Sequence, residues 1–323
     1  MKIITIKNYM KDSDINKREG SYIGENHYTR VIQENADVYY ETDNGEKKLL
    51  LKFRKGVIPQ KYCKDTFKAL YKMAQKKNVN RGAAAGSVKT KKLPKYVHKI
   101  KTKHRFRVFY KDKKGTLKKD NISNPSMSNI MGYYDRPDRN HYRTHKKSPA
   151  SLCRMTAFTR DNKDKWNATL PLIRKADKVF KKLVPSRHKV QHERASEVPK
   201  FQIEDTAFST VTTNYNWRTA CHKDKGDLVE GFGNLVVLEK DKCGYNCPSY
   251  KGGYLGFPKF KVCVDVRQGD FLAMDVHQWH CNTDMIEGKF DIKNNKYPKD
   301  MDYGRLSLVC YLRKKMIKCK NDK

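Results

Sequence analysis

The sequence has no run of 18 or more apolar residues, which is the length that a membrane-spanning helix needs. Its first residues, MKIITIKNYMKDSD, also lack the apolar segment of a secretory signal. We therefore expect an intracellular protein, in the nucleus or the cytoplasm of its host. It should neither cross a membrane nor be secreted, and we expect it to be a monomer.

Acidic residues are scarce. The 323 residues include 35 Asp and Glu against 70 Lys and Arg, which leaves a formal net charge of +35. This charge is far larger than solubility requires and favours a polyanionic partner. The partner that we expect is nucleic acid, and DNA in particular. An anionic membrane surface is the second candidate.

Cysteines do not form a regular framework. There are nine of them, an odd number, and the closest pair is Cys243 and Cys247. A second closely spaced pair is lacking, which argues against a zinc knuckle of the usual kind. We expect most of the cysteines to be buried thiols in a reducing compartment.

Short β-rich runs separated by glycines dominate the C-terminal part of the chain. They are residues 207–213, 235–238, 261–266, 270–274 and 306–312. Many short strands with turns at this density predict a sandwich or a barrel and not a βαβ fold.

The preceding part of the chain mixes strand and helix signals. Runs between residues 28 and 53, with the turn Asp43-Asn44-Gly45, predict a hairpin or small meander. Apolar residues at helical spacing predict helices over about 59–77 and 162–184. Pro171 leaves open whether the second helix begins there instead.

We therefore expect three regions. Residues 1–150 would form a basic α+β region that packs on the core and contributes to substrate binding. Residues 151–200 would supply helical support, and residues 201–323 would form the β-rich core.

Two N-terminal stretches are candidates for substrate contact. Small residues follow Arg81, where the backbone could approach a ligand closely and the arginine could meet a phosphate; a flexible connector is the alternative. The basic segment that ends in HRFRVFYKDKK interleaves aromatic residues with lysines and arginines. That mixture suits phosphate contact with base stacking, although a solvated strand with a charged face has the same composition.

The triplet His222-Lys223-Asp224 and the later pair Trp279-His280 carry the chemistry. Two histidines and one carboxylate form the facial triad that holds Fe(II) and leaves positions open for reaction. If the segment is a strand, His222 and Asp224 point to the same side. His277 competes with His280 as the second histidine ligand, and we favour His280.

The same alternation selects further candidates. Arg218, Asn216 and Asn214 would share the inward face of the strand with His222. The two asparagines are candidates for substrate binding. Arg218 could contact substrate or co-substrate, or pair with a core carboxylate such as Asp275.

Arg305 and Ser307 share one face of the last strand, together with Val309 and Tyr311. The planar fork of an arginine matches a carboxylate, and a serine two residues later adds a hydroxyl group. This pair fits the distal carboxylate of 2-oxoglutarate.

These residues carry a family resemblance. The motif His222-x-Asp224 and the segments GGYLGFPKF (252–260), GDFLAMDVHQWH (269–280) and RLSLVCYLR (305–313) resemble those of the Fe(II)/2-oxoglutarate dioxygenases. The arrangement is similar to the TET/JBP-type branch, which acts on nucleic acids. The segment between His280 and Arg305 is longer than is usual for the family.

The resemblance implies an α+β fold with a double-stranded β-helix (jelly-roll) core, packed helices and a basic N-terminal extension. It also implies an enzyme that uses Fe(II), 2-oxoglutarate and O₂, with His222, Asp224 and His280 as metal ligands. The first functional hypothesis is oxidation of the 5-methyl group of 5-methylcytosine or thymine in DNA. A protein prolyl or lysyl hydroxylase is the alternative, and a non-catalytic nucleic-acid-binding protein is the third possibility.

Overall fold

The computed structural model describes residues 1–89, 93, 95–117, 122–136, 152–240, 250–287 and 304–320, with the side chains of 102–104 and 286–287 excepted. Cys243 and Cys247 lie outside the described residues. Residues 288–303, which make up most of the long segment before Arg305, also lie outside them.

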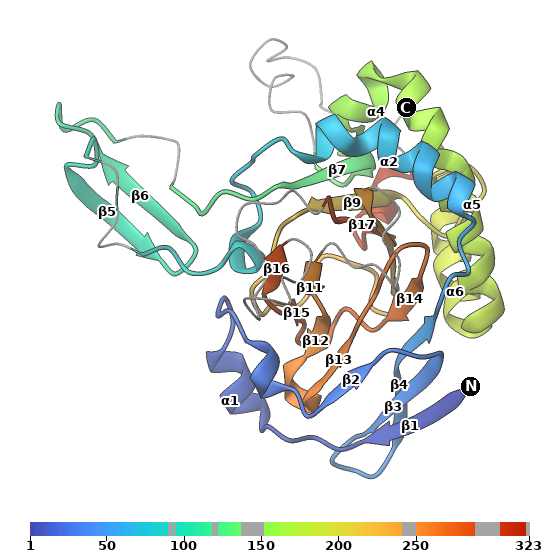
Figure 1. The fold of residues 1–323 in the computed structure, drawn as a ribbon. Helices are drawn as coiled ribbons and strands as arrows, with labels where there is room; N and C mark the ends of the chain where they lie inside the picture. The colour runs from blue at the N-terminus through green and yellow to red at the C-terminus, as the bar shows by residue number, and fades with distance from the viewer. Residues whose placement is uncertain are drawn as a thin grey trace, which may run out of the picture.

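Two β-sheets form the centre of the molecule (Figure 1). In the described residues the large sheet has the strand order β1-β3-β4-β14-β10-β17-β9-β7-β8, and the small sheet has the order β15-β12-β13-β2. The strands of the large sheet are β1 (Lys2–Ile6), β3 (Ala36–Glu41), β4 (Lys47–Arg54), β7 (Ser128–Tyr134), β8 (Arg154–Met155), β9 (Thr210–Tyr215), β10 (Gly233–Leu238), β14 (Phe271–Met274) and β17 (Leu306–Tyr311). The strands of the small sheet are β2 (Arg30–Ile32), β12 (Leu255–Phe257), β13 (Val262–Val264) and β15 (Cys281–Asn282).

The chain crosses repeatedly between the two sheets. From β9 in the large sheet it passes to a bridge between His222 and His280 beside β15, and then returns to β10. It next enters the small sheet as β12 and β13, returns as β14, crosses again at β15 and ends in β17. Strands β14, β10, β17 and β9 pair antiparallel. This path is that of a jelly-roll, and it confirms the predicted α+β class with a double-stranded β-helix core.

Alternating side chains of β10 show how two hydrophobic layers share one sheet. Val236 and Leu238 pack in the outer layer with the helices. Leu235 and Val237 pack in the inner layer, between the large and the small sheet. Burial of each such side chain contributes roughly 1.5–3 kcal/mol, so both layers stabilise the strand that lies between them.

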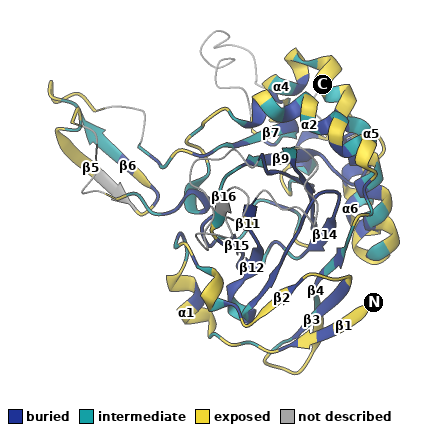
Figure 2. Ribbon diagram, viewed as in Figure 1, coloured by how far each residue is buried: buried dark blue, intermediate teal, exposed yellow. Residues whose placement is uncertain are grey.

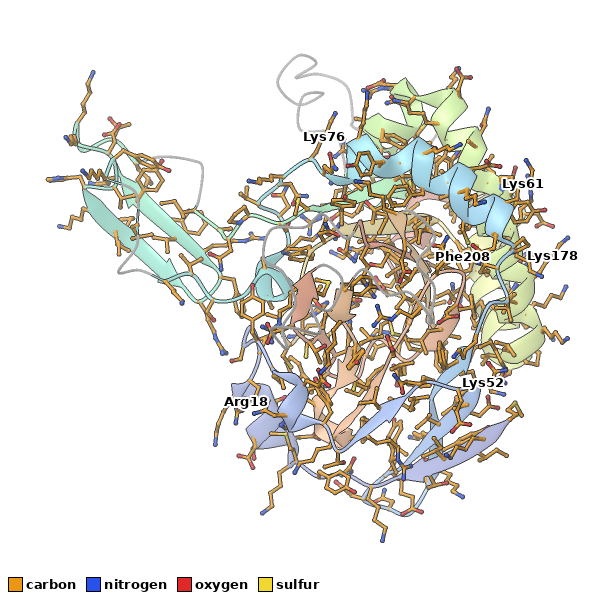
Figure 3. All side chains as sticks on the ribbon, in the orientation of Figure 1. Arg18, Lys52, Lys61, Lys76, Lys178 and Phe208 are labelled. Carbon is orange, nitrogen blue, oxygen red and sulfur yellow. A yellow bond between two sulfur atoms is a disulfide. The ribbon has the colours of Figure 1, made fainter. Side chains whose placement is uncertain are left out.

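Helices cover the outer face of the large sheet (Figure 1). They are α2 (Gln60–Ala74), α4 (Ala157–Asp161), α5 (Lys163–Leu183) and α6 (Pro185–Ser196). Figure 2 shows exposed residues on their outward faces and buried residues in the strands beneath. Lys61 and Lys178 point outward from α2 and α5 (Figure 3). The two predicted helices are confirmed, and Pro171 lies inside α5, so it does not start that helix.

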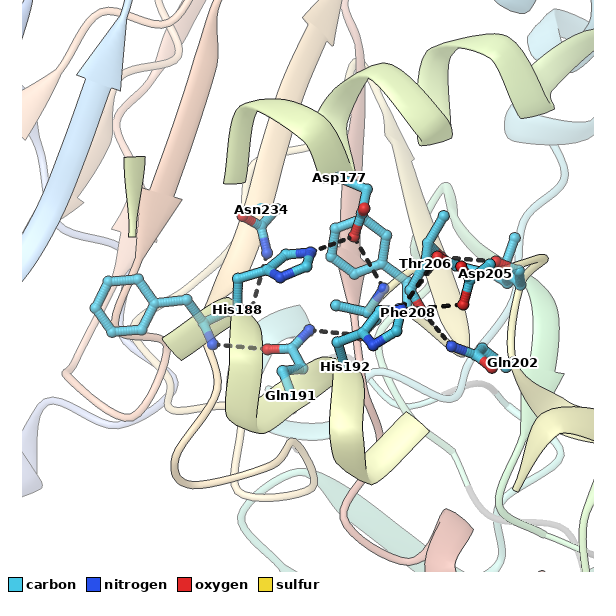
Figure 4. A network of polar contacts seen from close by, with 12 residues as sticks. Asp177, His188, Gln191, His192, Gln202, Asp205, Thr206, Phe208 and Asn234 are labelled. Atoms are coloured by element: carbon cyan, nitrogen blue, oxygen red, sulfur yellow. Dashed lines mark hydrogen bonds and ion pairs between the residues drawn. The ribbon is translucent and has the colours of Figure 1, made fainter. Parts of the chain in front are cut away.

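A buried polar network fastens α5 and α6 to the core (Figure 4). Oδ1 of Asp177 accepts a hydrogen bond from the backbone N–H of Ala207 (2.9 Å) and lies 2.9 Å from Nε2 of His188. The side-chain amide of Gln191 donates to the carbonyl oxygen of Ala207 (2.8 Å) and accepts from the backbone N–H of Phe232 (3.0 Å). The network therefore holds the chain at the residues that lead into β9 and β10.

N-terminal strands extend both sheets. In the large sheet β4 pairs antiparallel with β14, and β3 pairs with β4 through the predicted turn, where Gly45 has a φ of +78°. In the small sheet β2 lies parallel to β13. The division into three regions at residues 150 and 200 remains a prediction.

The remaining elements are short. They are α1 (Asp12–Lys17), the paired strands β5 (Lys99–His104) and β6 (Arg107–Lys111), the paired strands β11 (Tyr250–Gly252) and β16 (Met285–Glu287), and the 3₁₀ turns η1 (Glu25–His27), η2 (Gly82–Ala85), η4 (Pro199–Phe201), η6 (Pro258–Phe260) and η7 (Met316–Cys319). Within the described ranges, no helix has both the length and the apolar character needed to cross a bilayer.

Seven cysteines lie in the described residues. The free thiols, all buried, are Cys63, Cys221, Cys263, Cys281 and Cys310. A disulfide joins Cys153 to Cys319. It connects the segment before α4 with η7 near the C-terminus.

Candidate active site

His222, Asp224 and His280 come together at one end of the jelly-roll. The backbones of His222 and His280 exchange two hydrogen bonds of 3.0 Å, so the two residues lie directly opposite each other. Nε2 of His222 lies 3.7 Å from Oδ1 of Asp224, and Nε2 of His280 lies 3.6 Å from Oδ2. One potential ligand atom from each residue lies within 4.8 Å of the others. The three groups can therefore bind one metal ion.

Backbone carbonyls orient both imidazole rings. Nδ1 of His222 is 2.7 Å from the carbonyl oxygen of Ala220, and Nδ1 of His280 is 2.9 Å from that of Gln278. A proton on each Nδ1 satisfies these contacts and leaves Nε2 as the free lone pair. Both free lone pairs then face Asp224.

The local electrostatics favour neutral His222 and ionised Asp224, which are the protonation states that bind a metal. Burial, together with the neighbouring His280, lowers the pKa of His222 to about 4. Burial opposes ionisation of Asp224, but contact with His280 and the charge of His222 outweigh it, so the pKa of Asp224 falls well below its usual value. Burial also opposes protonation of His280, yet its contact with Asp224 prevails and raises the pKa of His280.

A cavity of about 280 Å³ opens at this cluster. All three residues line it, and the inward-facing side chains of the last strand continue the wall. That wall contains Arg305, Ser307, Val309 and Tyr311, as the predicted alternation along β17 requires, followed by Arg313. Leu235, Leu255 and Met274 add apolar surface.

Arg305 presents unsatisfied donors. Its side chain belongs to a residue that is only 3% exposed, yet Nε and one terminal nitrogen have no hydrogen-bond partner among the described residues. Buried donors without a hydrogen-bond partner are costly, and a bound carboxylate would relieve that cost. Arg305 therefore fits a site for the distal carboxylate of 2-oxoglutarate in the cavity wall.

Asn216 and Asn214 support this strand in different ways. Asn216 has a φ of +41°, and its Oδ1 accepts a hydrogen bond of 2.7 Å from the backbone N–H of Arg305. It therefore positions Arg305 and does not line the cavity. Asn214 does line the cavity, and its amide donates to the hydroxyl oxygen of Ser307 at 3.4 Å.

Arg81 also lies in the cavity wall, beside η2. Its charge contributes to lowering the pKa values of both His222 and Asp224. Nε of Arg81 donates to the carbonyl oxygen of Ser128 at 3.4 Å. The structure thus brings this N-terminal candidate to the metal-binding cluster.

The structure places Arg218 outside the cavity. Its guanidinium donates to the carbonyl oxygens of Asn282 (3.1 Å) and Ile23 (2.9 Å), pairs with Asp284 and stacks on Tyr22. The inward direction predicted from strand alternation does not apply, because β9 ends at residue 215 and the chain turns there. Arg218 therefore connects the N-terminal segment to the core.

His277 also lies apart from the metal-binding cluster. Its Nε2 is 3.2 Å from the carbonyl oxygen of Leu228. The geometry therefore favours His280 over His277 as a ligand, as expected from the sequence.

The sequence did not single out two further charged residues of the cavity, Asp227 and Arg313. Arg313 contacts Asp227 at 3.5 Å and Asp135 at 3.2 Å. Burial and the nearby Asp224 raise the pKa of Asp227. Alternation continued beyond Tyr311 could have identified Arg313, whereas Asp227 carries no comparable signal because it lies in a loop.

Comparison with known proteins places this arrangement in a family. Residues 139–314, more than half of the chain, match Tet_JBP, the oxygenase domain of the 2OGFeDO superfamily. The chain belongs to the Tet/JBP oxygenase family. Fe(II), 2-oxoglutarate and O₂ are the cofactors of this superfamily, which confirms the predicted cofactor set. The assignment of individual residues to these cofactors remains a proposal.

Several relatives of this Tet/JBP oxygenase are named thymine dioxygenases. Thymine dioxygenase JBP1-B of Trypanosoma cruzi is 32% identical over 188 residues, which cover 58% of this chain and 19% of that protein. Bifunctional helicase and thymine dioxygenase JBP2 of Leishmania infantum is 26% identical over 278 residues, 86% of this chain and 19% of that protein. The chain thus spans about a fifth of the length of these relatives.

A solved structure described as NgTET1 in complex with 5mC DNA gives a TM-score of 0.45 at 11% sequence identity. The comparison covers 95% of this chain and 92% of that chain.

Proposed function

We propose that this chain is an Fe(II)- and 2-oxoglutarate-dependent dioxygenase that oxidises the 5-methyl group of a pyrimidine, 5-methylcytosine or thymine, in DNA. The observation that carries the proposal is one cavity lined by both a three-residue metal-binding cluster and a buried guanidinium with two nitrogens that have no hydrogen-bond partner among the described residues. The relatives named thymine dioxygenases support the choice of a pyrimidine methyl group. The net charge of +35 supports a DNA partner.

In this proposal His222, Asp224 and His280 hold the metal on one side. Two neutral imidazoles and one carboxylate form a donor set that would suit Fe(II). The backbone carbonyls at Nδ1 prevent the rings from rotating, which preserves the direction of both lone pairs.

Arg305 and Ser307 hold the far carboxylate of 2-oxoglutarate. The guanidinium supplies its unpaired donors, and the hydroxyl of Ser307 lies on the same face of β17. The apolar side chains of Leu235, Met274 and Val309 line the same cavity and would exclude water from the carbon chain of the co-substrate.

Iron, 2-oxoglutarate and O₂ together supply the oxidant that removes hydrogen from a methyl group. The chain contributes positioning and the exclusion of water around the three ligands, two of which come from buried or nearly buried side chains. A base within a duplex cannot reach such a cavity, so the target nucleotide has to rotate out of the helix. Asn214, Asp227 and Arg313 line the cavity and would hydrogen-bond its edge in exchange for their present contacts.

The test is incubation with iron, 2-oxoglutarate and a set of DNAs, followed by mass spectrometry of the digested nucleosides. Wild-type protein should produce an oxidised pyrimidine together with succinate, and His222→Ala should abolish both products. His277→Ala is the matched control, because that histidine lies outside the cluster and should leave the reaction intact.

A different result would contradict the proposal. If DNA remained unmodified while a peptide library gained the mass of one oxygen atom on proline or lysine, the protein would be a prolyl or lysyl hydroxylase. Loss of activity in His277→Ala, with retention in His280→Ala, would overturn the choice of ligand.

A further inference from the structure

A β-hairpin stands away from the body of the molecule (Figure 1). It consists of β5 and β6, and with the adjoining residues it forms what we call the arm, residues 95–117. Two strands alone are marginally stable in water, so a hairpin in this position needs a firm attachment.

The attachment lies at the inner end of the arm. Arg105 donates hydrogen bonds of 3.2 Å to the hydroxyl of Ser87 and to the carbonyl oxygen of Lys17. The ring of Phe106 is buried against Gly20, where a Cβ atom would lie 2.3 Å from that ring. The turn between β5 and β6 is therefore fixed to the body, and the opposite end projects outward.

The chain that follows the arm is bonded to a turn that lines the active-site cavity. The amide of Asn124, on the returning chain, donates to the carbonyl oxygens of Ala85 (2.9 Å) and Gly86 (3.2 Å). Ala84, in the same 3₁₀ turn η2, and Arg81 just before it line the cavity. A ligand bound by the arm would therefore lie at a fixed position relative to the metal-binding cluster.

The charge of the arm is almost entirely positive. Residues 95–117 contain nine Lys and Arg but only one acidic residue, Asp112. Within the sheet, Lys99 lies directly opposite Lys111. Like charges at opposed positions destabilise a strand pair. A bound polyanion would offset this repulsion, because both lysines would be attracted to it.

The outer end presents its lysines in a fixed turn. Oδ1 of Asp112 accepts hydrogen bonds of 3.0 Å from the backbone N–H groups of both Lys114 and Thr116. Lys113 and Lys114 are exposed there. Tyr96, which is 53% exposed, packs against Tyr110 on the same hairpin, with ring centroids 5.6 Å apart.

We propose that the arm binds the phosphate backbone of duplex DNA beside the nucleotide that enters the cavity. The inference rests on the proposed function for its choice of DNA as the polyanion. Fixed lysines on a projecting two-stranded ribbon suit regularly spaced phosphates, and contacts of this type set position without reading sequence. The arm thereby supplies contacts that offset the free energy needed to unstack the target base.

The experiment measures binding of full-length protein to a methylated duplex by fluorescence anisotropy over a series of salt concentrations. Lys113→Gln/Lys114→Gln removes two charges, while the turn remains held by Asp112. Two lost phosphate contacts should weaken binding about 10- to 30-fold at 0.15 M salt and lower the salt slope by about 2. Lys178→Gln/Lys182→Gln removes the same charge from exposed positions of α5, on the side of the body away from the arm (Figure 1), and should leave both quantities nearly unchanged.

Lys99→Gln gives a second and independent signature. It relieves the repulsion with Lys111, so the melting temperature of the free protein should stay equal or rise while the affinity for DNA falls. A variant that merely damaged the hairpin would lower both.

Equal affinity of wild-type protein and Lys113→Gln/Lys114→Gln would overturn the inference, and so would an equal loss in the α5 control. Arm-dependent binding to duplex RNA but not to duplex DNA would also overturn it. The proposed function is judged separately by the nucleoside products: a wild-type protein that oxidises DNA while its arm variants bind normally refutes the arm alone. Arm-dependent DNA binding without oxidised bases refutes the reaction alone.

Discussion

At the scale of single residues, the buried donors of Arg305 indicate a bound anion. They have no partner among the described residues, so the free protein carries a cost that a carboxylate removes. Arg305→Lys keeps the charge but loses the planar fork. We expect the KM for 2-oxoglutarate to rise about 10- to 100-fold, in line with roughly 1.4–2.7 kcal/mol of lost interaction. Steady-state kinetics with varied 2-oxoglutarate would measure this.

Arg218→Lys provides the matched comparison. Arg218 does not line the cavity, and it contacts Asn282, Ile23 and Asp284. Its replacement should therefore lower the melting temperature and leave the KM for 2-oxoglutarate unchanged. A raised KM in Arg218→Lys, with no change in Arg305→Lys, would show that Arg218 and not Arg305 binds the co-substrate.

The pH dependence of metal binding follows from the three ligands. Asp224 is ionised and His222 is neutral well below neutral pH, whereas contact with Asp224 raises the pKa of His280. A protonated His280 competes with the metal, so affinity is lost as the pH falls through the raised pKa of His280. Anaerobic Fe(II) titrations should show about a tenfold weaker affinity per pH unit below that pKa, which corresponds to one proton. A dependence on two protons in the same range would show that His222 is protonated as well.

At the scale of elements, the alternation of side chains predicted the inward-facing residues correctly within strands but not beyond their ends. The prediction for β17 was right, since Arg305, Ser307, Val309 and Tyr311 all line the cavity. The alternation predicted from Asn214 to Asp224 failed at Asn216 and Arg218, which do not line the cavity, because β9 ends before the positive φ of Asn216. Strand parity is a local rule, and it ends where the backbone leaves the extended region.

Gln191 is one of the buried side chains that hold helix α6, and the effect of its loss can be predicted. Gln191→Ala would leave the carbonyl of Ala207 and the N–H of Phe232 without their partner. Each such buried group costs about 1–3 kcal/mol, so the free energy of unfolding should fall by about 2–4 kcal/mol. Urea denaturation measures it, with Lys189→Ala as the control: that side chain is 77% exposed, and its loss should change stability by less than about 0.5 kcal/mol. Equal stabilities of the two variants would show that the hydrogen bonds of Gln191 in Figure 4 do not stabilise the protein.

At the scale of the whole molecule, the Cys153–Cys319 disulfide closes a loop of 166 residues between the helical layer and the C-terminus. A cross-link of this kind typically stabilises by about 2–4 kcal/mol, mainly by restricting the unfolded chain. Cys319→Ser should therefore lower the melting temperature by several degrees. Wild-type protein with reductant should melt at the same temperature as the variant, and reductant should have no further effect on the variant. Identical melting of oxidised and reduced wild-type protein would exclude a stabilising bond.

The sequence alone determined the features that depend on neighbours along the chain. These are the periodicity of α2 and α5, the turn at Gly45, the strands around the glycines, and the spacing His222-x-Asp224. Composition also determined the charge, because charge does not depend on folding.

Only the tertiary structure decided which distant residues meet. Three features depend on how strands from different parts of the chain pair: the bridge between His222 and His280, the burial of Arg305 in the cavity wall, and the contact of Arg218 with the N-terminal segment. The attachment of the basic arm to Lys17 and Ser87 has the same origin. Local patterns specify the face of a strand, whereas long-range packing determines what that face encounters.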